Sequence, residues 1–162
     1  MKYAIVYSSR TGNTEMLAKA IKEVLPETDC VYFGAPDLKA LEADMIYLGF
    51  WTDKGSCDED SSRFMEKLRG QQVFLFGTAG FGGAAEYFEQ ILSRAKAKLG
   101  PELRIAGSFM CQGKMPQSVR ERYLQMEDSP RRSAMLANFD AALSHPDADE
   151  LAKLKAAVLE SM

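Results

Sequence analysis

The chain has 162 residues, which is a usual length for one domain and is enough to bury a sizeable core. Its composition, with 46% hydrophobic and 27% charged residues, is ordinary for a globular protein. The net charge of −3 argues against nucleic acid as a partner, because a phosphate backbone requires a basic surface.

The cysteine and histidine residues give little support to metal or disulfide chemistry. Cys30, Cys57 and Cys111 are far apart and odd in number, and the lone histidine is His145. They have no zinc-type spacing, and three reduced thiols are typical of a cytoplasmic protein. The apolar run near the N-terminus has about five residues, fewer than a signal peptide or a membrane helix needs. We therefore expect a cytoplasmic protein that does not bind a membrane.

Apolar runs alternate along the chain with helical periodicity. The runs predict buried strands at residues 3–7, 30–34, 45–50, 73–77 and 105–110. Apolar residues at helical spacing predict helices between them, at residues 16–24, 64–68 and 88–99. Unbroken apolar strands are buried on both faces, and alternation with helices makes a sheet parallel. The prediction is an α/β three-layer sandwich around a five-stranded parallel sheet.

The pattern changes after Pro116. Residues 119–126, 135–143 and 151–158 have helical spacing, and no further strand is predicted. We predict a single domain over residues 1–162, with the core sheet and its loops in 1–111 and a helical C-terminal extension in 112–162. The extension is expected to pack on the sheet or on a partner.

The loops that follow the first, third and fourth strands are the candidate site, because ligands of parallel sheets bind beyond the carboxyl ends of the strands. The first loop, SSRTGNT at residues 8–14, leads into a helix whose free N–H groups and partial positive charge favour an anion. Hydroxyls, an amide and a glycine suit a phosphate monoester there. The candidate residues are Ser9, Arg10, Thr11, Gly12, Asn13 and Thr14. The alternative is that Thr11 or Asn13 simply caps the helix.

The second and third loops supply an aromatic ring and glycines. Trp51 begins the loop WTDKGSCDED, where it either covers a flat ligand or is a partly buried edge residue. In the loop TAGFGG the glycines let backbone approach a ligand, and Phe81 either caps that ligand or packs into the core. The candidate residues of both loops are Trp51, Thr52, Asp53, Gly55, Thr78, Ala79, Gly80, Phe81 and Gly82. The three loops together indicate a flat heterocycle with a phosphate tail.

Competing motifs do not fit the sequence. The spacing from Gly107 to Gly113 and the residue after Lys114 differ from a Walker A motif, and no Rossmann GxGxxG is present. His145 lies in HPDADE, which is typical of a turn and helix start, so a structural role is expected for it.

These residues resemble the flavodoxin family, which binds FMN. The segment SRTGNTE at Ser9–Glu15 is similar to that family's phosphate loop, Trp51 is similar to the aromatic of its second loop, and EYF at 86–88 matches a segment after the third. The resemblance covers residues 1–111 and implies the strand order 2-1-3-4-5, with FMN at the switch point between strands 1 and 3, as is known for flavodoxins. The segments GFWTDKGSCDE, FLFGTAGFGG and FMCQGKMP resemble flavodoxin-like proteins of anaerobic bacteria, some of which are associated with bilirubin reductases.

The sequence departs from the family pattern at three positions. Thr52 follows the second-loop aromatic, where the family often has glycine, and Gly55 comes later. Ala85 precedes EYF in place of a stacking tyrosine, so Phe81 substitutes for it or one flavin face stays open. Arg10 is unusual in such a phosphate loop and is expected either to add charge to the phosphate or to turn outward.

The resemblance implies an FMN electron carrier that shuttles low-potential electrons to a redox partner enzyme, as a monomer or weak dimer. The acids of the second loop, Asp53, Asp58, Glu59 and Asp60, outnumber Lys54 and would lower the potential of a nearby flavin. One alternative is an FMN-dependent reductase that acts directly on an organic substrate or quinone. Another is an accessory subunit that docks on a larger reductase through residues 114–143.

Overall fold

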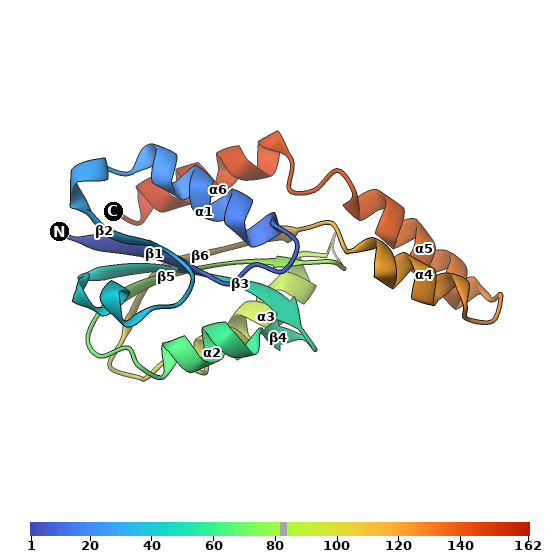
Figure 1. Ribbon diagram of the computed structural model, residues 1–162, viewed down its shortest axis with the longest axis horizontal. Coiled ribbons are helices and arrows are strands. Elements are labelled where there is room, and N and C mark those ends of the chain that lie inside the picture. Colours follow the sequence, from blue (N-terminus) through green and yellow to red (C-terminus); the bar gives the residue numbers. More distant parts are fainter. Residues whose placement is uncertain (82–83) are drawn as a thin grey trace.

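The computed structural model describes residues 1–81 and 84–162 and contains a parallel β-sheet between two layers of helices (Figure 1). The main strands are β1 (Tyr3–Tyr7), β2 (Cys30–Gly34), β3 (Met45–Asp53), β5 (Gln72–Ala79) and β6 (Arg104–Gln112). They lie in the order β2-β1-β3-β5-β6, and every pair along this path is parallel. The predicted fold class and strand order are therefore confirmed.

The central strands are buried on both faces. Tyr47 and Leu48 of β3 are buried in the two different core clusters, one on each face, and Val73 to Phe76 of β5 are fully buried. Side chains alternate between the two faces of a strand, so these runs supply both halves of the core. This burial explains why the strands read as unbroken apolar sequences rather than alternating ones.

Helices cover the two faces as separate pairs. On one face lie α1 (Asn13–Val24) and α6 (Ala148–Glu160), and on the other α2 (Glu59–Met65) and α3 (Ala85–Lys96) (Figure 1). Two 3₁₀ turns, η1 (Glu27–Asp29) and η2 (Leu38–Glu42), flank β2. Leu154 and Val158 of α6 are fully buried in the same core cluster as Leu17 and Ile21 of α1. The last helix is thus part of the sandwich.

The remaining helices, α4 (Gln117–Leu124) and α5 (Pro130–Ala142), form a hairpin between β6 and α6. Figure 1 shows this hairpin beyond the carboxyl edge of the sheet and directed away from it. The hairpin has a small core of its own, with Val119, Tyr123 and Phe139 buried in it. The segment 112–162 therefore consists of two structurally different parts, a protruding hairpin and a helix of the sandwich.

A short strand, β4 (Ser56–Cys57), was not predicted. It pairs antiparallel with the end of β3, with Asp53 opposite Ser56. Lys54 and Gly55 connect the two strands, and both have positive φ, 52° and 79°. Two-residue hairpin turns favour this left-handed geometry, because it matches the twist of the strands. The predicted second loop is therefore a hairpin in its first half. Within residues 1–81 and 84–162, no helix is long and apolar enough to cross a membrane.

Candidate functional site

A cavity of about 410 Å³ lies at the carboxyl ends of β1, β3 and β5. Its volume is in the range of small-molecule sites, roughly 300–1,000 Å³. The predicted residues that line it are Ser9, Arg10, Thr11, Asn13, Thr14, Trp51, Thr52, Asp53, Gly55, Thr78, Gly80 and Phe81. Gly12 and Ala79 do not line it, and the predicted Gly82 lies outside the described residues. Tertiary structure thus brings residues from three separate loops around one cavity.

The first loop presents donors toward this cavity. Gly12 is the N-cap of α1 and has φ 88°, a left-handed conformation that glycine adopts without strain. The Ser9 Oγ accepts from the backbone N–H groups of Gly12 (3.1 Å) and Glu15 (3.3 Å), which leaves its hydroxyl hydrogen to donate. No acceptor for the backbone N–H groups of Thr11, Asn13 and Thr14 is found within 1–81 and 84–162. Since Gly12 caps the helix without a side-chain bond, the alternative that Thr11 or Asn13 caps it does not apply.

Asn13 ties this loop to the base of the helical hairpin. Its Nδ2 donates to the Lys114 carbonyl (2.7 Å), and the Thr11 hydroxyl reaches the same carbonyl at 3.4 Å. The Asn13 Oδ1 is buried and has no partner among the described residues. A side chain at Gly113 would displace Asn13, since a Cβ would lie 2.4 Å from the Asn13 Nδ2. Lys114 therefore lies against the first loop, although it is 101 positions from Asn13 in the sequence.

Trp51 and Thr52 belong to the last residues of β3. Trp51 is half-buried, and its backbone N–H donates to the Asp58 Oδ1 (3.2 Å). The Thr52 hydroxyl donates to the Thr78 carbonyl of β5 (2.8 Å), and Thr52 does not have positive φ. The left-handed residues are Lys54 and Gly55 instead, so the departure from the family glycine causes no strain at Thr52.

Most acids of the second loop do not face the cavity. Asp58 is buried and caps α2 through the backbone N–H of Ser61 (3.2 Å). Glu59 pairs with Arg63 on α2, and Asp60 lines a separate surface depression beside the same helix. Asp53 is the carboxylate among the described residues that line the cavity, whereas Arg10, Lys54, Lys114 and Arg122 are cationic there. Asp58, Glu59 and Asp60 do not line the cavity that was expected to hold the ligand, because they cap α2 or lie on its surface.

Buried hydroxyls connect the first and third loops beneath the cavity. The Thr14 Oγ1 donates to the Phe50 carbonyl (3.1 Å) and lies 3.2 Å from the Thr78 Oγ1. Both threonines are nearly inaccessible to solvent. The pair links α1 to β3 and β5 at the switch point of the sheet, so the floor of the cavity is a hydrogen-bonded unit.

Sequence reasoning missed the contribution of the hairpin and of α3. The additional lining residues are Lys54, Tyr87, Lys114, Met115, Pro116, Val119, Arg122 and Tyr123. Tyr87 belongs to the EYF segment, which could have indicated it. Nothing in the sequence around Tyr123 distinguishes it from a core residue of a helix. Burial raises the pKa of the Tyr123 phenol, so it stays protonated at neutral pH.

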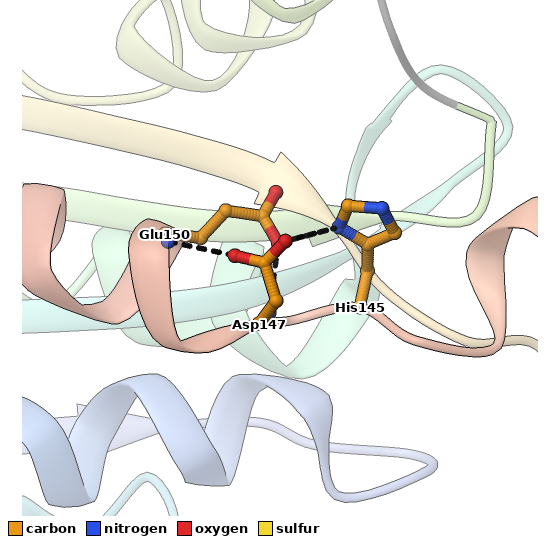
Figure 2. Close-up of side chains that lie close together, drawn as sticks. All are labelled: His145, Asp147 and Glu150. Carbon is orange, nitrogen blue, oxygen red and sulfur yellow. Dashed lines mark hydrogen bonds and ion pairs between the residues drawn. The ribbon is translucent and has the colours of Figure 1, made fainter.

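A second polar cluster lies where the hairpin joins α6 (Figure 2). Asp147 and Glu150 form a capping box at the start of α6, and the His145 Nδ1 lies 2.6 Å from the Glu150 Oε1. The carboxylate can only accept, so the ring nitrogen donates. The His145 carbonyl accepts from the Lys114 N–H (3.0 Å). These bonds give His145 the structural role that its sequence context predicted.

The doubly wound sheet and the cavity at its switch point define a flavodoxin-like fold. A family model described as a flavodoxin domain matches residues 4–159, and the chain belongs to this family. A flavodoxin-like domain-containing protein BilS from Clostridium symbiosum (strain WAL-14163) is 42% identical over 183 residues, covering 100% of this chain and 96% of that one. A protein of the same name from Clostridioides difficile (strain CD3) is 31% identical over 162 residues, with 93% and 90% covered.

Solved structures show the same fold at low sequence identity. Oxidised flavodoxin 2 from Bacillus cereus has a TM-score of 0.58 and 19% identity, covering 99% of this chain and 97% of that one. The flavodoxin from Streptococcus pneumoniae TIGR4 has a TM-score of 0.54 and 17% identity, covering 89% and 98%. A flavoprotein in complex with FMN from Lactobacillus acidophilus NCFM has a TM-score of 0.51 and 16% identity, covering 67% and 92%.

Proposed function

We propose that the protein binds FMN in the cavity at the sheet edge and carries electrons to a redox partner enzyme. The observation that carries this proposal is the convergence of a donor-rich helix start, the Trp51 ring and the Gly80 backbone in one cavity of a flavodoxin-family chain. The structurally similar flavoprotein from Lactobacillus acidophilus is described as a complex with FMN.

The first loop fits a phosphate group. The backbone N–H groups at the start of α1 and the Ser9 hydroxyl are donors available to an anion. The side chains of Arg10 and Lys114 line the same cavity and add positive charge there. We therefore assign the phosphate end of FMN to Ser9–Thr14.

Aromatic side chains fit the flavin ring. Trp51, Phe81, Tyr87 and Tyr123 all line the cavity. A flat ring such as that of a flavin stacks on aromatic side chains, and the stacking removes apolar surface of both from water. Ala85 stands where the family often has a stacking tyrosine. We propose that Tyr87 of α3 and Tyr123 of α4 supply aromatic rings to the flavin instead. When bound, FMN supplies one- and two-electron transfer, while the protein provides binding, orientation and charge.

The charge around the cavity argues against a strongly lowered potential. A reduced flavin is more negative than an oxidised one, so nearby cations stabilise it and carboxylates destabilise it. Arg10, Lys54, Lys114 and Arg122 line the cavity together with Asp53. We propose that the reduction potential is higher than the acidic loop sequence predicted.

The same cations suggest an acidic partner surface. The cavity-lining residues Lys54, Lys114 and Arg122 are also exposed to solvent, where a partner protein can contact them. An acidic patch around the electron entry site of a partner would be attracted to them, which speeds encounter at low salt.

The experiment uses hexacyanoferrate(III) as an anionic acceptor for the reduced FMN-loaded protein. Reoxidation should slow with rising salt and in Arg122→Glu, whereas Arg131→Glu on the far part of the hairpin serves as the matched control. Equal rates at low and high salt would remove the electrostatic docking proposal.

A direct reductase is the second candidate. Met115, Val119 and Tyr123 form an apolar wall on the hairpin side of the cavity, which a flat organic substrate or quinone could contact. Purified protein loaded with FMN should not consume NADPH or NADH if it is a carrier. Steady turnover of either nucleotide, with or without a quinone, would favour the reductase.

FMN binding itself is tested by two optical measurements. The purified protein should absorb near roughly 450 nm as a flavoprotein does. Because Trp51 is the one tryptophan and lines the cavity, FMN added to flavin-free protein should quench its fluorescence with a saturable curve. Riboflavin, which lacks the phosphate, should bind more weakly than FMN. A chain that neither retains nor takes up FMN would end the proposal.

A further inference from the structure

We propose that Asn138 of the α4–α5 hairpin is a positioning residue for the flavin site, acting through the Gly80–Phe81 peptide. The inference rests on the proposed FMN function and adds a role for α5. Asn138 itself does not line the cavity, whereas Gly80 and Phe81 do.

The side-chain amides of Asn138 and Gln112 and the backbone carbonyl of Gly80 form a hydrogen-bonded triangle at the third loop. The Asn138 Nδ2 and the Gln112 Nε2 each donate to the Gly80 carbonyl, both at 3.1 Å. The Gln112 Nε2 also donates to the Asn138 Oδ1 (3.3 Å). The network fixes how both amide groups are turned, because flipping the Asn138 amide would place oxygen against the carbonyl and nitrogen against nitrogen. Gln112 is buried, so its unmet bonds would be costly.

This contact determines which way the next N–H points. A trans peptide is planar, so the Phe81 N–H is directed opposite to the Gly80 carbonyl and hence away from Asn138 and Gln112. In the part of the chain that the structure describes, the Phe81 N–H has no acceptor. Because Gly80 and Phe81 line the cavity, we infer that this N–H is a donor available there, where a carbonyl oxygen or ring nitrogen of a heterocycle could accept from it.

The hairpin is built to keep Asn138 in place. Phe139, the next residue of α5, is 1% exposed and packs with Val119 and Tyr123 in the hairpin core. Met115 packs closely against Gly80, since a Cβ there would lie 2.5 Å from the Met115 Cγ. Among the described residues, the side-chain hydrogen bonds that join residues 117–142 to β6 and to the end of β5 are those of the Asn138 amide, with Gln112 and with Gly80. Movement of the hairpin would thus be transmitted to the Gly80 peptide.

The variant Asn138→Asp tests this role with little change in size. It replaces the Nδ2 donor by an oxygen that faces the Gly80 carbonyl. We expect FMN affinity to fall about tenfold, as loss of a partly buried hydrogen bond implies, and the visible band of bound flavin to shift. Gln112→Glu removes the second donor and provides an independent variant should Asn138→Asp fold poorly. Thermal unfolding of the flavin-free variants verifies folding.

Asp140→Asn is the matched control on the same helix. Asp140 is paired with Arg120 and has no contact with Gly80, so this variant weakens the hairpin surface alone. It should bind FMN within about twofold of the wild type. Wild-type affinity in Asn138→Asp, or an equal loss in Asp140→Asn, would overturn the positioning role.

An NMR chemical shift separates this inference from the proposed function. In flavin-free protein, the chemical shift of the Phe81 N–H should change in Asn138→Asp but not in Asp140→Asn. If the wild type bound no FMN, the proposed function would fail, and this chemical shift alone would decide whether Asn138 positions the peptide. An unchanged Phe81 amide would then refute the inference.

Discussion

The guanidinium of Arg10 lies over the ring of Trp51, 5.5 Å from the ring centroid. This contact joins the first loop to the end of β3 across the cavity. The sequence left Arg10 with two orientations, toward a phosphate or outward to a partner. The observed arrangement is a third one, in which the cation covers the aromatic residue predicted to stack on the ligand.

Replacing Arg10 should therefore change both the fluorescence of Trp51 and FMN affinity. A cation–π contact at an exposed site is worth about 0.5–1 kcal/mol, and the cation also lies near the donors of the first loop. We expect Arg10→Ala to alter Trp51 emission in the flavin-free protein and to weaken FMN binding about two- to tenfold. Arg10→Lys should leave FMN affinity close to that of the wild type but still change Trp51 emission, because lysine keeps the positive charge and lacks the planar guanidinium.

Lys19→Ala removes a cation from α1 that does not line the cavity and is the control for net charge. Emission and affinity identical to the wild type in Arg10→Ala would show that the contact has no role in solution.

The hydroxyl pair beneath the cavity should contribute to stability. Thr14→Val leaves the Phe50 carbonyl without its buried donor, so the free energy of unfolding should fall by about 1–3 kcal/mol in urea titrations. Thr78→Val should also destabilise the protein, and the double variant should lose less than the sum, because the two hydroxyls interact. Thr28→Val, at an exposed position, provides the baseline for the same chemical change. Strictly additive losses would argue against a coupled pair.

Cations at the cavity should set the potential of bound FMN. Lys114→Glu keeps the backbone bonds that Lys114 makes to Asn13 and His145, because they use its carbonyl and N–H. It reverses one charge beside the cavity, so the midpoint potential should fall by some tens of millivolts at low salt and by less at high salt. Potentiometric titration measures the change, and Lys153→Glu on α6 controls for net charge. A potential that rises in Lys114→Glu would contradict the proposed electrostatics.

Stability should decline at alkaline pH. Burial raises the pKa of Cys57 and Cys111 above their ordinary 9.0, and it raises the pKa of Tyr47 above 10.0. As pH rises past about 9, the unfolded chain releases these protons first and therefore binds fewer than the folded chain, so the free energy of unfolding decreases. Urea unfolding between pH 7 and pH 10.5 should show a flat region followed by this decrease. Cys111→Ala should make the decrease shallower, whereas an unchanged slope would assign it to other groups.

The sequence by itself determined the sheet and the main parts of its edge. Unbroken apolar runs arise where strands are buried on both faces, so β1, β3 and β5 could be found from residues 3–7, 45–50 and 73–77 alone. Loops after parallel strands must meet at one edge, so the sequence predicts that Ser9, Trp51 and Gly80 lie around a common site.

Tertiary structure alone decided the charge and the closure of that site. Asp58 and Asp60 read as part of an acidic loop, yet the β3–β4 turn sends the chain into α2, which takes both residues away from the cavity. Periodicity identifies helices near residues 119–143 but does not say against what they pack. Only the folded chain brings Lys114 to Asn13 and Asn138 to Gly80, because contacts between distant segments depend on how whole elements pack rather than on local spacing.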